Sequence, residues 1–310
     1  MRNSDHALDR RLWLSLLLNA AITAAEFVGG MFASSIALLA DAVHNLNDVV
    51  ALVLAIVARK LGRRPPSTRH TYGLKRVEVL AALINALFLL GVTALIAREA
   101  LERILHPRPV RADIMLAVAS IALVANVLAV FLLRSHPAHD LNMKTAFLHL
   151  LQDALASLVV VIAALFVHTP VGLYLDPIAS LVVGIVVLHS AVGIVWEALG
   201  MLVEAVPPDV NVKNLVQGVA QAFPKATLHH VHVWQVGPGQ RVLTAHLSVP
   251  DMDLETCEAL SGRIRAFLAE HWNIQHATLE PEVNGCGNPD MLGSWEMEAG
   301  AAQNDNPPER

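Results

Sequence analysis

Apolar residues gather in six long runs in the first two thirds of the chain, each close to the roughly 20 residues that a helix needs to cross a bilayer. The runs cover residues 12–30, 36–58, 78–105, 113–134, 142–168 and 178–203. An even number of spans returns the chain to the side on which it began. The pattern therefore predicts six transmembrane helices with both termini on one side of the membrane.

The pattern changes after Pro207 and Pro208 to short amphipathic segments. Helical spacing at 210–219 is followed by two strand-like stretches around a Gly-Pro-Gly-Gln turn, by a second helical stretch at 253–270 and by a short strand at 274–280. We therefore expect an α-helical membrane protein with a transmembrane domain at 1–206, a small cytoplasmic α-β-β-α-β domain at 207–285 and a disordered tail at 286–310.

Composition excludes several classes of protein. With 55% hydrophobic and 16% charged residues and a mean hydropathy of +0.50, the chain is too apolar for a water-soluble enzyme. The net charge is -5 and the soluble part is acidic, so a nucleic-acid partner is not expected. Cys257 and Cys286 are too few for a disulfide framework.

Lys and Arg are distributed unevenly between the connections. They concentrate at 2–11, 59–76 and 134–144, whereas the connections at 30–35 and 169–177 contain neither. The connection at 98–111, which contains four Arg, is the one exception. Positively charged connections stay on the cytoplasmic side. Both termini are therefore predicted to be cytoplasmic.

Two matched pairs of ionisable residues interrupt the apolar runs, where such groups are costly and usually line a protein interior or a pathway. His44 and Asp48 lie four residues apart in the second run, and His149 and Asp153 repeat that spacing in the fifth. Residues at this spacing share one helix face. Two imidazoles and two carboxylates suit tetrahedral Zn²⁺, whereas Mg²⁺ prefers more oxygen ligands.

Other readings of these pairs stay open. Each could be a hydrogen-bonded pair that neutralises itself within its own helix. An intramembrane metal hydrolase is disfavoured, because all four groups are used as ligands and no His-Glu-x-x-His motif occurs. Asp41 is a candidate to orient His44 or to line the pathway, with a capping or packing role as the alternative. Glu26 is expected to join helices through hydrogen bonds.

Several motifs together resemble those of the cation diffusion facilitator family, in its zinc-transporting branch of the cobalt-zinc-cadmium efflux type. They are Ser-Ile-Ala-Leu-Leu-Ala-Asp-Ala-Val-His at 35–44 with Asp48, Thr-Tyr-Gly-Leu-Lys-Arg-Val-Glu-Val-Leu-Ala at 71–81, His149 with Asp153, Asp-Pro-Ile-Ala-Ser at 176–180, His-Val-Trp at 232–234 and Ala-His at 245–246. The resemblance implies a bacterial inner-membrane homodimer, with a metallochaperone-like cytoplasmic domain, that exports Zn²⁺ in exchange for protons. It also implies that His44, Asp48, His149 and Asp153 hold the ion and favour zinc over cadmium.

The chain departs from the resemblance in the loop between the second and third runs. Some members carry an additional site there, built from one Asp and two His, but only His70 is present in the matching stretch. One ligand cannot make a stable site. His70 is either a transient relay point or an ordinary surface histidine.

The predicted cytoplasmic domain is rich in histidine. Alternation along its strands predicts a zinc-binding cluster of His232, His246 and His276, completed by Glu280 or Glu282. The family's cytoplasmic metal sites resemble this cluster, with His229 and Cys286 as further candidate ligands. Imidazoles on a solvated face are the alternative.

The sequence thus predicts a Zn²⁺/H⁺ antiporter, with Co²⁺ and Cd²⁺ as further candidate substrates and zinc as a regulatory ligand. The expected partners are a second copy of the chain, membrane lipid, divalent metal ions and protons. The alternative is a metal-sensing or scaffold membrane protein that binds zinc without transporting it. An enzyme is not expected.

Overall fold

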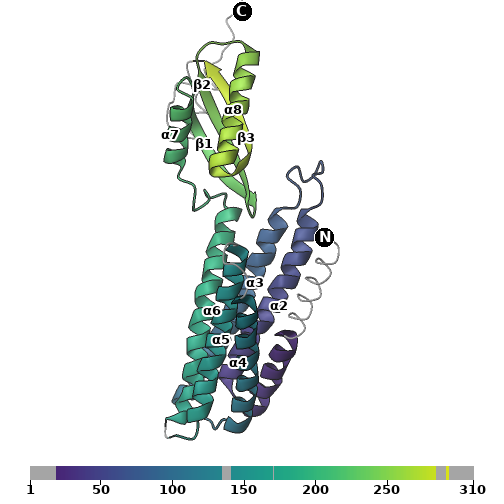
Figure 1. Cartoon of the computed structure of the whole chain (residues 1–310), viewed down its shortest axis with the longest axis vertical. Coiled ribbons are helices and arrows are strands. Elements are labelled where there is room, and N and C mark those ends of the chain that lie inside the picture. The colour runs from purple at the N-terminus through teal and green to yellow at the C-terminus, as the bar shows by residue number, and fades with distance from the viewer. Residues whose placement is uncertain (1–18, 135–140, 170, 284–290, 293–310) are drawn as a thin grey trace, which may run out of the picture. The chain divides into compact units, whose positions relative to one another are not determined.

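A computed structural model describes residues 19–134, 141–169, 171–283 and 291–292 (Figure 1). The side chains of residues 55, 132–134, 141–146, 148 and 149 are outside this description. The described residues fall into two compact units, which are presented separately. The helical unit draws on Met1–Val57 and Ala81–Val195, and the sheet unit on Ala58–Leu80 and Trp196–Arg310. Of the predicted disordered tail, only residues 291–292 are described, and the backbone N–H of Val231 donates a hydrogen bond to Met291 O at 2.8 Å. Cys286 lies outside the described residues.

The helical unit contains a helix at 19–33 and most of five longer helices. These are α2 (Ile36–Gly62), α3 (Arg76–Leu105), α4 (Ala112–Arg134), α5 (Leu141–Phe166) and α6 (Gly172–Leu202). Among the described residues, α2, α3, α4 and α6 contain stretches long and apolar enough to cross a membrane, and α5 contributes the shorter apolar stretch Leu150–Phe166. The chain is therefore a helical membrane protein, while the count of six spans stays a prediction.

A buried carboxylate on α6 sets the start of α2. Ser35 Oγ donates a hydrogen bond to Asp176 Oδ1 at 2.5 Å, and the backbone N–H of Ile36 donates to Asp176 Oδ2 at 2.9 Å. The N–H of Leu38 in turn donates to Ser35 Oγ at 3.1 Å. These bonds satisfy N–H groups that have no partner within the helix, and the carboxylate lies at the positive end of the helix dipole. Asp176 thereby fixes α2, which carries two predicted metal ligands, against α6.

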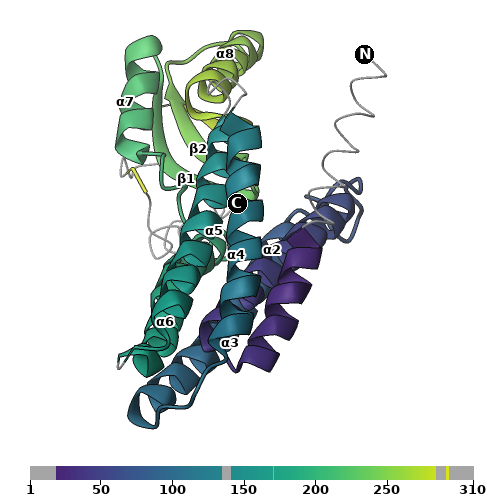
Figure 2. The same ribbon diagram turned by 60° about the horizontal axis from the view of Figure 1, so that its bottom comes forward.

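Small residues allow close packing around α2, α4 and α5. Ala37 on α2, Ala119 on α4 and Ala163 on α5 are almost completely buried in one cluster, around the larger side chains of Leu38 and Met115. Figures 1 and 2 show α4 and α5 side by side. Such close packing is the main source of helix association in lipid, where no hydrophobic force draws helices together.

The sheet unit has the element order α-β-β-α-β that the sequence pattern predicts. Its elements are α7 (Val212–Ala222), β1 (Thr227–Gly237), β2 (Gln240–Val249), α8 (Leu254–Trp272) and β3 (Ile274–Val283). β2 is the central strand, antiparallel to β1 and parallel to β3. The parallel pairing follows from α8, which returns the chain so that β3 runs in the direction of β2.

The two faces of β2 differ in character. Leu243, Ala245 and Leu247 are buried in the core with residues of both helices, whereas Thr244 and His246 lie on the opposite face and are only half-buried. This alternation follows from the period of two in a strand. The polar face is therefore available for chemistry.

Candidate metal sites

Helices α2 and α5 bring three of the predicted ligands of the intramembrane site together. His44 Nε2 lies 3.8 Å from Asp48 Oδ2 and 3.4 Å from Asp153 Oδ1. One ligand atom from each residue lies within 4.8 Å of the other two. Ligands held 2.0–2.2 Å from a tetrahedral ion are about 3.4 Å apart. The cluster is thus close to the dimensions of a zinc site.

The fourth predicted ligand, His149, has its side chain outside the described part of the structure. Its backbone belongs to α5, four residues before Asp153. Residues at that spacing share a helix face. Participation of His149 in the cluster therefore stays a prediction.

The cluster lies in an interior that contains no basic side chain in the described apolar stretches of the helices. His44 and Asp153 are 7% and 4% exposed, and Asp48 is partly exposed. The helical unit has no Lys or Arg at 19–33, 36–57, 81–97, 112–131, 150–166 or 172–195. Buried carboxylates need compensation by a cation or a proton. The site is consequently suited to a divalent cation.

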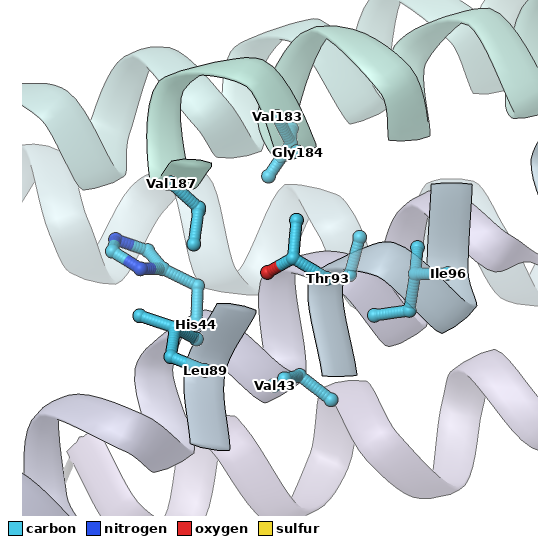
Figure 3. A pocket seen from close by; sticks show the side chains of 9 residues that line it. Val43, His44, Leu89, Thr93, Ile96, Val183, Gly184 and Val187 are labelled. Carbon is cyan, nitrogen blue, oxygen red and sulfur yellow. The ribbon is translucent and has the colours of Figure 1, made fainter. Parts of the chain in front are cut away.

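Two cavities adjoin His44. The smaller has a volume of about 10 Å³, enough for about one water molecule, and Figure 3 shows it between His44, Thr93 and Val187. The larger, of about 380 Å³, is lined mainly by apolar side chains of α5 and α6 together with His44 and Gln152. His44 therefore borders space on the α6 side of the cluster.

A second set of polar groups lies one helix turn from the cluster. Ser157 Oγ donates to Asp41 Oδ2 at 3.1 Å, and Asn126 Nδ2 donates to Ser157 Oγ at 3.1 Å. The hydrogen bond recorded for Asp41 thus comes from α5, so its proposed role in orienting His44 stays untested. Sequence reasoning missed Ser157, although its position four residues after Asp153 places it on the same face of α5.

His70 is exposed in the loop between α2 and α3. Its backbone N–H and C=O both bond to Ser67, with N–O distances of 3.1 and 3.0 Å. Among the described residues it belongs to neither metal-ligand cluster. The geometry of the turn therefore adds nothing to the idea of a relay site.

A second cluster forms on the polar face of the sheet and consists of His229, His246 and Glu282. Glu282 Oε2 lies 3.1 Å from His229 Nε2, and Glu282 Oε1 lies 2.5 Å from His246 Nδ1. Glu280 lies 3.8 Å from His246 Nε2 and its side chain is 73% exposed. Of the two glutamates considered from the sequence, Glu282 is therefore the better placed.

The expected trio of His232, His246 and His276 is not assembled, and this corrects the strand-alternation argument. His229 pairs with His246 in register, whereas His232 pairs with Thr244 and is exposed. His276 is opposite Val242, four residues before His246, or about 13 Å along the strand at 3.3 Å per residue.

A β-bulge explains the change of ligand. The register of β1 shifts between His229 and His232, and His230 has a left-handed φ of 49°. The bulge interrupts the alternation, so that the rings of His229 and His230 lie 5.3 and 4.7 Å from the ring of His246. His230, which was not among the predicted ligands, thus lies beside the cluster, and no short-range sequence signal announces a bulge.

Comparison with known proteins covers both parts of the chain. Residues 12–203 match the family model described as the cation efflux transmembrane domain, and residues 207–283 match the cation efflux protein cytoplasmic domain. Together the matches cover most of the sequence. They agree with the helical and sheet-containing parts of the structure.

Similar proteins span nearly the whole chain. The zinc transporter ZitB of Escherichia coli is 39% identical over 284 residues, covering 91% of this chain and 90% of ZitB. The metal cation efflux system protein CzcD of Cupriavidus metallidurans is 30% identical over 302 residues, covering 94% and 95%. A cadmium, cobalt and zinc/H⁺-K⁺ antiporter of Bacillus subtilis is 30% identical over 284 residues, covering 91% of each chain.

The motifs, the helical membrane part, the domain with the three-stranded sheet and these matches all agree. They confirm the predicted family and the prediction of a transporter rather than an enzyme. The chain belongs to the cation efflux family, also called the cation diffusion facilitators, a family of integral membrane transporters.

Proposed function

We propose that this protein exports zinc from the cytoplasm in exchange for protons through a site formed by His44, Asp48, His149 and Asp153. The observation that carries the proposal is the cluster of His44, Asp48 and Asp153 inside helices without Lys or Arg. Relatives described as zinc transporters, and one described as an antiporter, support it.

The ligand chemistry favours zinc. Imidazole nitrogen and carboxylate oxygen together suit a borderline divalent ion, and four such groups complete a tetrahedron. Mg²⁺ would retain several waters and prefer an all-oxygen shell. Co²⁺ and Cd²⁺ are further candidate substrates, because geometry and ligand type discriminate among such ions only in part.

Exchange with protons follows from the same ligands. Histidine binds metal only when neutral and aspartate only when ionised, so protons and zinc compete for these atoms. When the site opens to the more acidic side, protons replace zinc on His44, His149 and the aspartates. The protonated site can then open to the cytoplasm again, because the bound protons compensate the buried carboxylates during this change.

The sheet unit supplies a regulatory site in this proposal. His246 and Glu282 are partly exposed and His229 is buried, and zinc bound by these three residues would favour one arrangement of a homodimer over another. The proposed layout is a six-span domain at 1–206 and a cytoplasmic domain at 207–285. Both termini are cytoplasmic, and the homodimer resides in a bacterial inner membrane.

Zinc uptake into sealed proteoliposomes tests the proposal. With an acidic lumen and a zinc-sensitive dye inside, the wild-type protein should accumulate zinc, and collapse of the pH gradient should stop accumulation. Asp153→Asn should abolish it. Asp113→Asn, the same change at an exposed carboxylate on α4, is the matched control and should transport normally.

Two results would contradict the proposal. Zinc binding without flux would identify a sensor or scaffold. Flux that does not respond to the pH gradient would identify a channel.

A further inference from the structure

A hydrogen bond, called here the Ser157–Asp41 bridge, joins α5 to α2 beside the intramembrane cluster. Ser157 Oγ donates to Asp41 Oδ2 at 3.1 Å, and the two residues are 0% and 1% exposed. Ser157 follows Asp153 by four residues on α5, and Asp41 precedes His44 by three on α2. Each residue of the bridge therefore shares a helix face with a proposed ligand, about one turn, or about 5.4 Å, along its helix.

A third helix fixes the direction of the bridge. Asn126 Nδ2 on α4 donates to Ser157 Oγ at 3.1 Å, and Asn126 is 6% exposed. A serine hydroxyl has a single hydrogen to donate. Because the Asn126 amide occupies an acceptor position on Oγ, the hydrogen of Ser157 points to Asp41. The three side chains form one directed chain from α4 through α5 to α2.

Close packing accompanies the bridge at the same level of the two helices. Ala40 directly precedes Asp41, Ala156 directly precedes Ser157, and both alanines pack in one hydrophobic cluster. Helix association in lipid depends on small residues of this kind and on hydrogen bonds between helices. The bridge therefore helps to set the distance between α2 and α5 near the ligands.

The distance between α2 and α5 decides the size of the metal site. His44 and Asp48 belong to α2, whereas Asp153 belongs to α5 and its Oδ1 lies 3.4 Å from His44 Nε2. A change in the separation of the helices changes this distance but not the spacing of the two ligands on α2. Zinc takes nitrogen and oxygen ligands at about 2.0–2.2 Å, and Cd²⁺ is a larger ion that needs longer bonds. A wider site would therefore bind zinc less well and exclude cadmium less.

We propose that Ser157 is a positioning residue, which holds α2 against α5 at the separation that zinc requires and so contributes to the choice of ion. The inference rests on the proposed function, because it takes His44, Asp48 and Asp153 as ligands of the transported ion. Ser157 is not itself a ligand. It acts through Asp41, and Asn126 orients its hydroxyl.

Ser157→Ala removes the bridge and leaves every proposed ligand in the chain. Zinc and cadmium flux into proteoliposomes, measured over a range of metal concentrations, tests its effect. The KM for zinc should rise about tenfold, which is typical when a residue behind the ligands is lost. The maximal rate of zinc flux should stay within about threefold of wild type, because the substitution weakens binding. The KM for cadmium should rise less, so that the ratio of cadmium to zinc flux at low concentration increases.

The alternative is that the bridge only stabilises the fold. Ser157→Ala would then reduce the flux of both ions in equal proportion, through a smaller amount of folded protein, and that result would overturn the inference. Ser157→Thr retains a hydroxyl at this position and should restore the wild-type ratio. Ser190→Ala is the matched control, because Ser190 is exposed on α6 and donates to the backbone of its own helix. It should match the wild type for both ions.

Asn126→Ala provides a second test, which does not depend on whether Ser157→Ala folds. Without the amide of Asn126, the hydroxyl of Ser157 is no longer directed to Asp41. The ratio of cadmium to zinc flux should therefore rise, but less than in Ser157→Ala. An unchanged ratio in Asn126→Ala would overturn the inference. A wild-type protein that does not carry zinc would instead refute the proposed function, so the two failures are distinguishable.

Discussion

The two candidate metal clusters use the same chemistry on different scaffolds. In the helical unit, His44 and Asp48 come from one turn of α2 and meet Asp153 from α5, among helices whose described apolar stretches contain no Lys or Arg. In the sheet unit, His229, His246 and Glu282 come from three strands, and their side chains are buried to nearly the same extent as those of the first cluster. The absence of Lys and Arg from these helix stretches makes the first cluster dependent on zinc or protons for charge compensation, whereas the second cluster lies beside the exposed carboxylate of Glu280. This difference in surroundings is consistent with the proposed transport site in one unit and the proposed regulatory site in the other.

The largest difference should appear when a ligand is removed from each cluster in turn. Asp48→Ala should reduce zinc flux into proteoliposomes about 100-fold or more, because a ligand set without its carboxylate holds zinc poorly. His229→Ala should leave flux at saturating zinc within about threefold of wild type, since the proposed regulatory site acts only through differential affinity. Equal losses in the two variants would remove the distinction between the clusters.

Replacement of a nitrogen ligand by an oxygen ligand tests whether the helical cluster selects the transported ion. His44→Asp replaces a nitrogen ligand with a harder oxygen and should raise the ratio of cadmium to zinc transport about tenfold. The rates of both ions in the same vesicle preparation give this ratio. His70→Asp serves as the control, because His70 is exposed and lies outside the cluster. A ratio that His44→Asp does not change would argue against His44 as a ligand.

Neighbouring glutamates on β3 allow a matched test of the sheet cluster. Glu282→Gln should weaken zinc binding at this site about tenfold or more, because Glu282 contacts both histidines. Glu280→Gln should have little effect, since that side chain is mostly exposed. Zinc titration of the full-length Asp48→Ala variant, in which the membrane site is disabled, isolates the signal. Equal effects of the two substitutions would contradict the proposed cluster and favour the alternative, in which the histidines lie on a solvated face and bind no metal.

The smallest expected effect is on the thermal stability of the sheet unit, through the ion pair between Arg241 and Asp209. Arg241 contacts both oxygens of Asp209 at 2.8 and 2.6 Å, and this hydrogen bonding lowers the pKa of Asp209 below its ordinary value. A lowered folded-state pKa gives stability that is present above the unfolded pKa and lost as pH falls through the folded pKa. Asp209→Asn should therefore lower the unfolding temperature slightly at about pH 7.

That difference should shrink as the pH is lowered below the ordinary pKa of aspartate, near 3.9. Thermal unfolding of the full-length protein in detergent, followed by circular dichroism at several pH values, measures it. The pair is exposed on the Asp209 side, so the shift should also shrink in high salt. A constant difference at all pH values would mean that the ion pair contributes no charge-dependent stability.

The sequence alone determined those features that depend on short-range periodicity. The spacing of His44 and Asp48 places both on one face of a helix wherever that helix is located, and Asp153 could be added because the same spacing recurs in another apolar run. The element order of the sheet unit could likewise be read from alternation and turns. These inferences succeeded because a helix or strand imposes its period locally.

Only the tertiary structure decided which distant residues meet. Because of the bulge at His230, His229 and not the predicted His232 lies beside His246. The register of β3 places His276 away from His246. The same strand brings Glu282 into contact with His229 and His246. In the helical unit, packing joined Glu26 to Asn45 and Ser157 to Asp41. Such contacts depend on strand register and on how helices pack, and a pattern of period 2 or 3.6 along one segment contains neither.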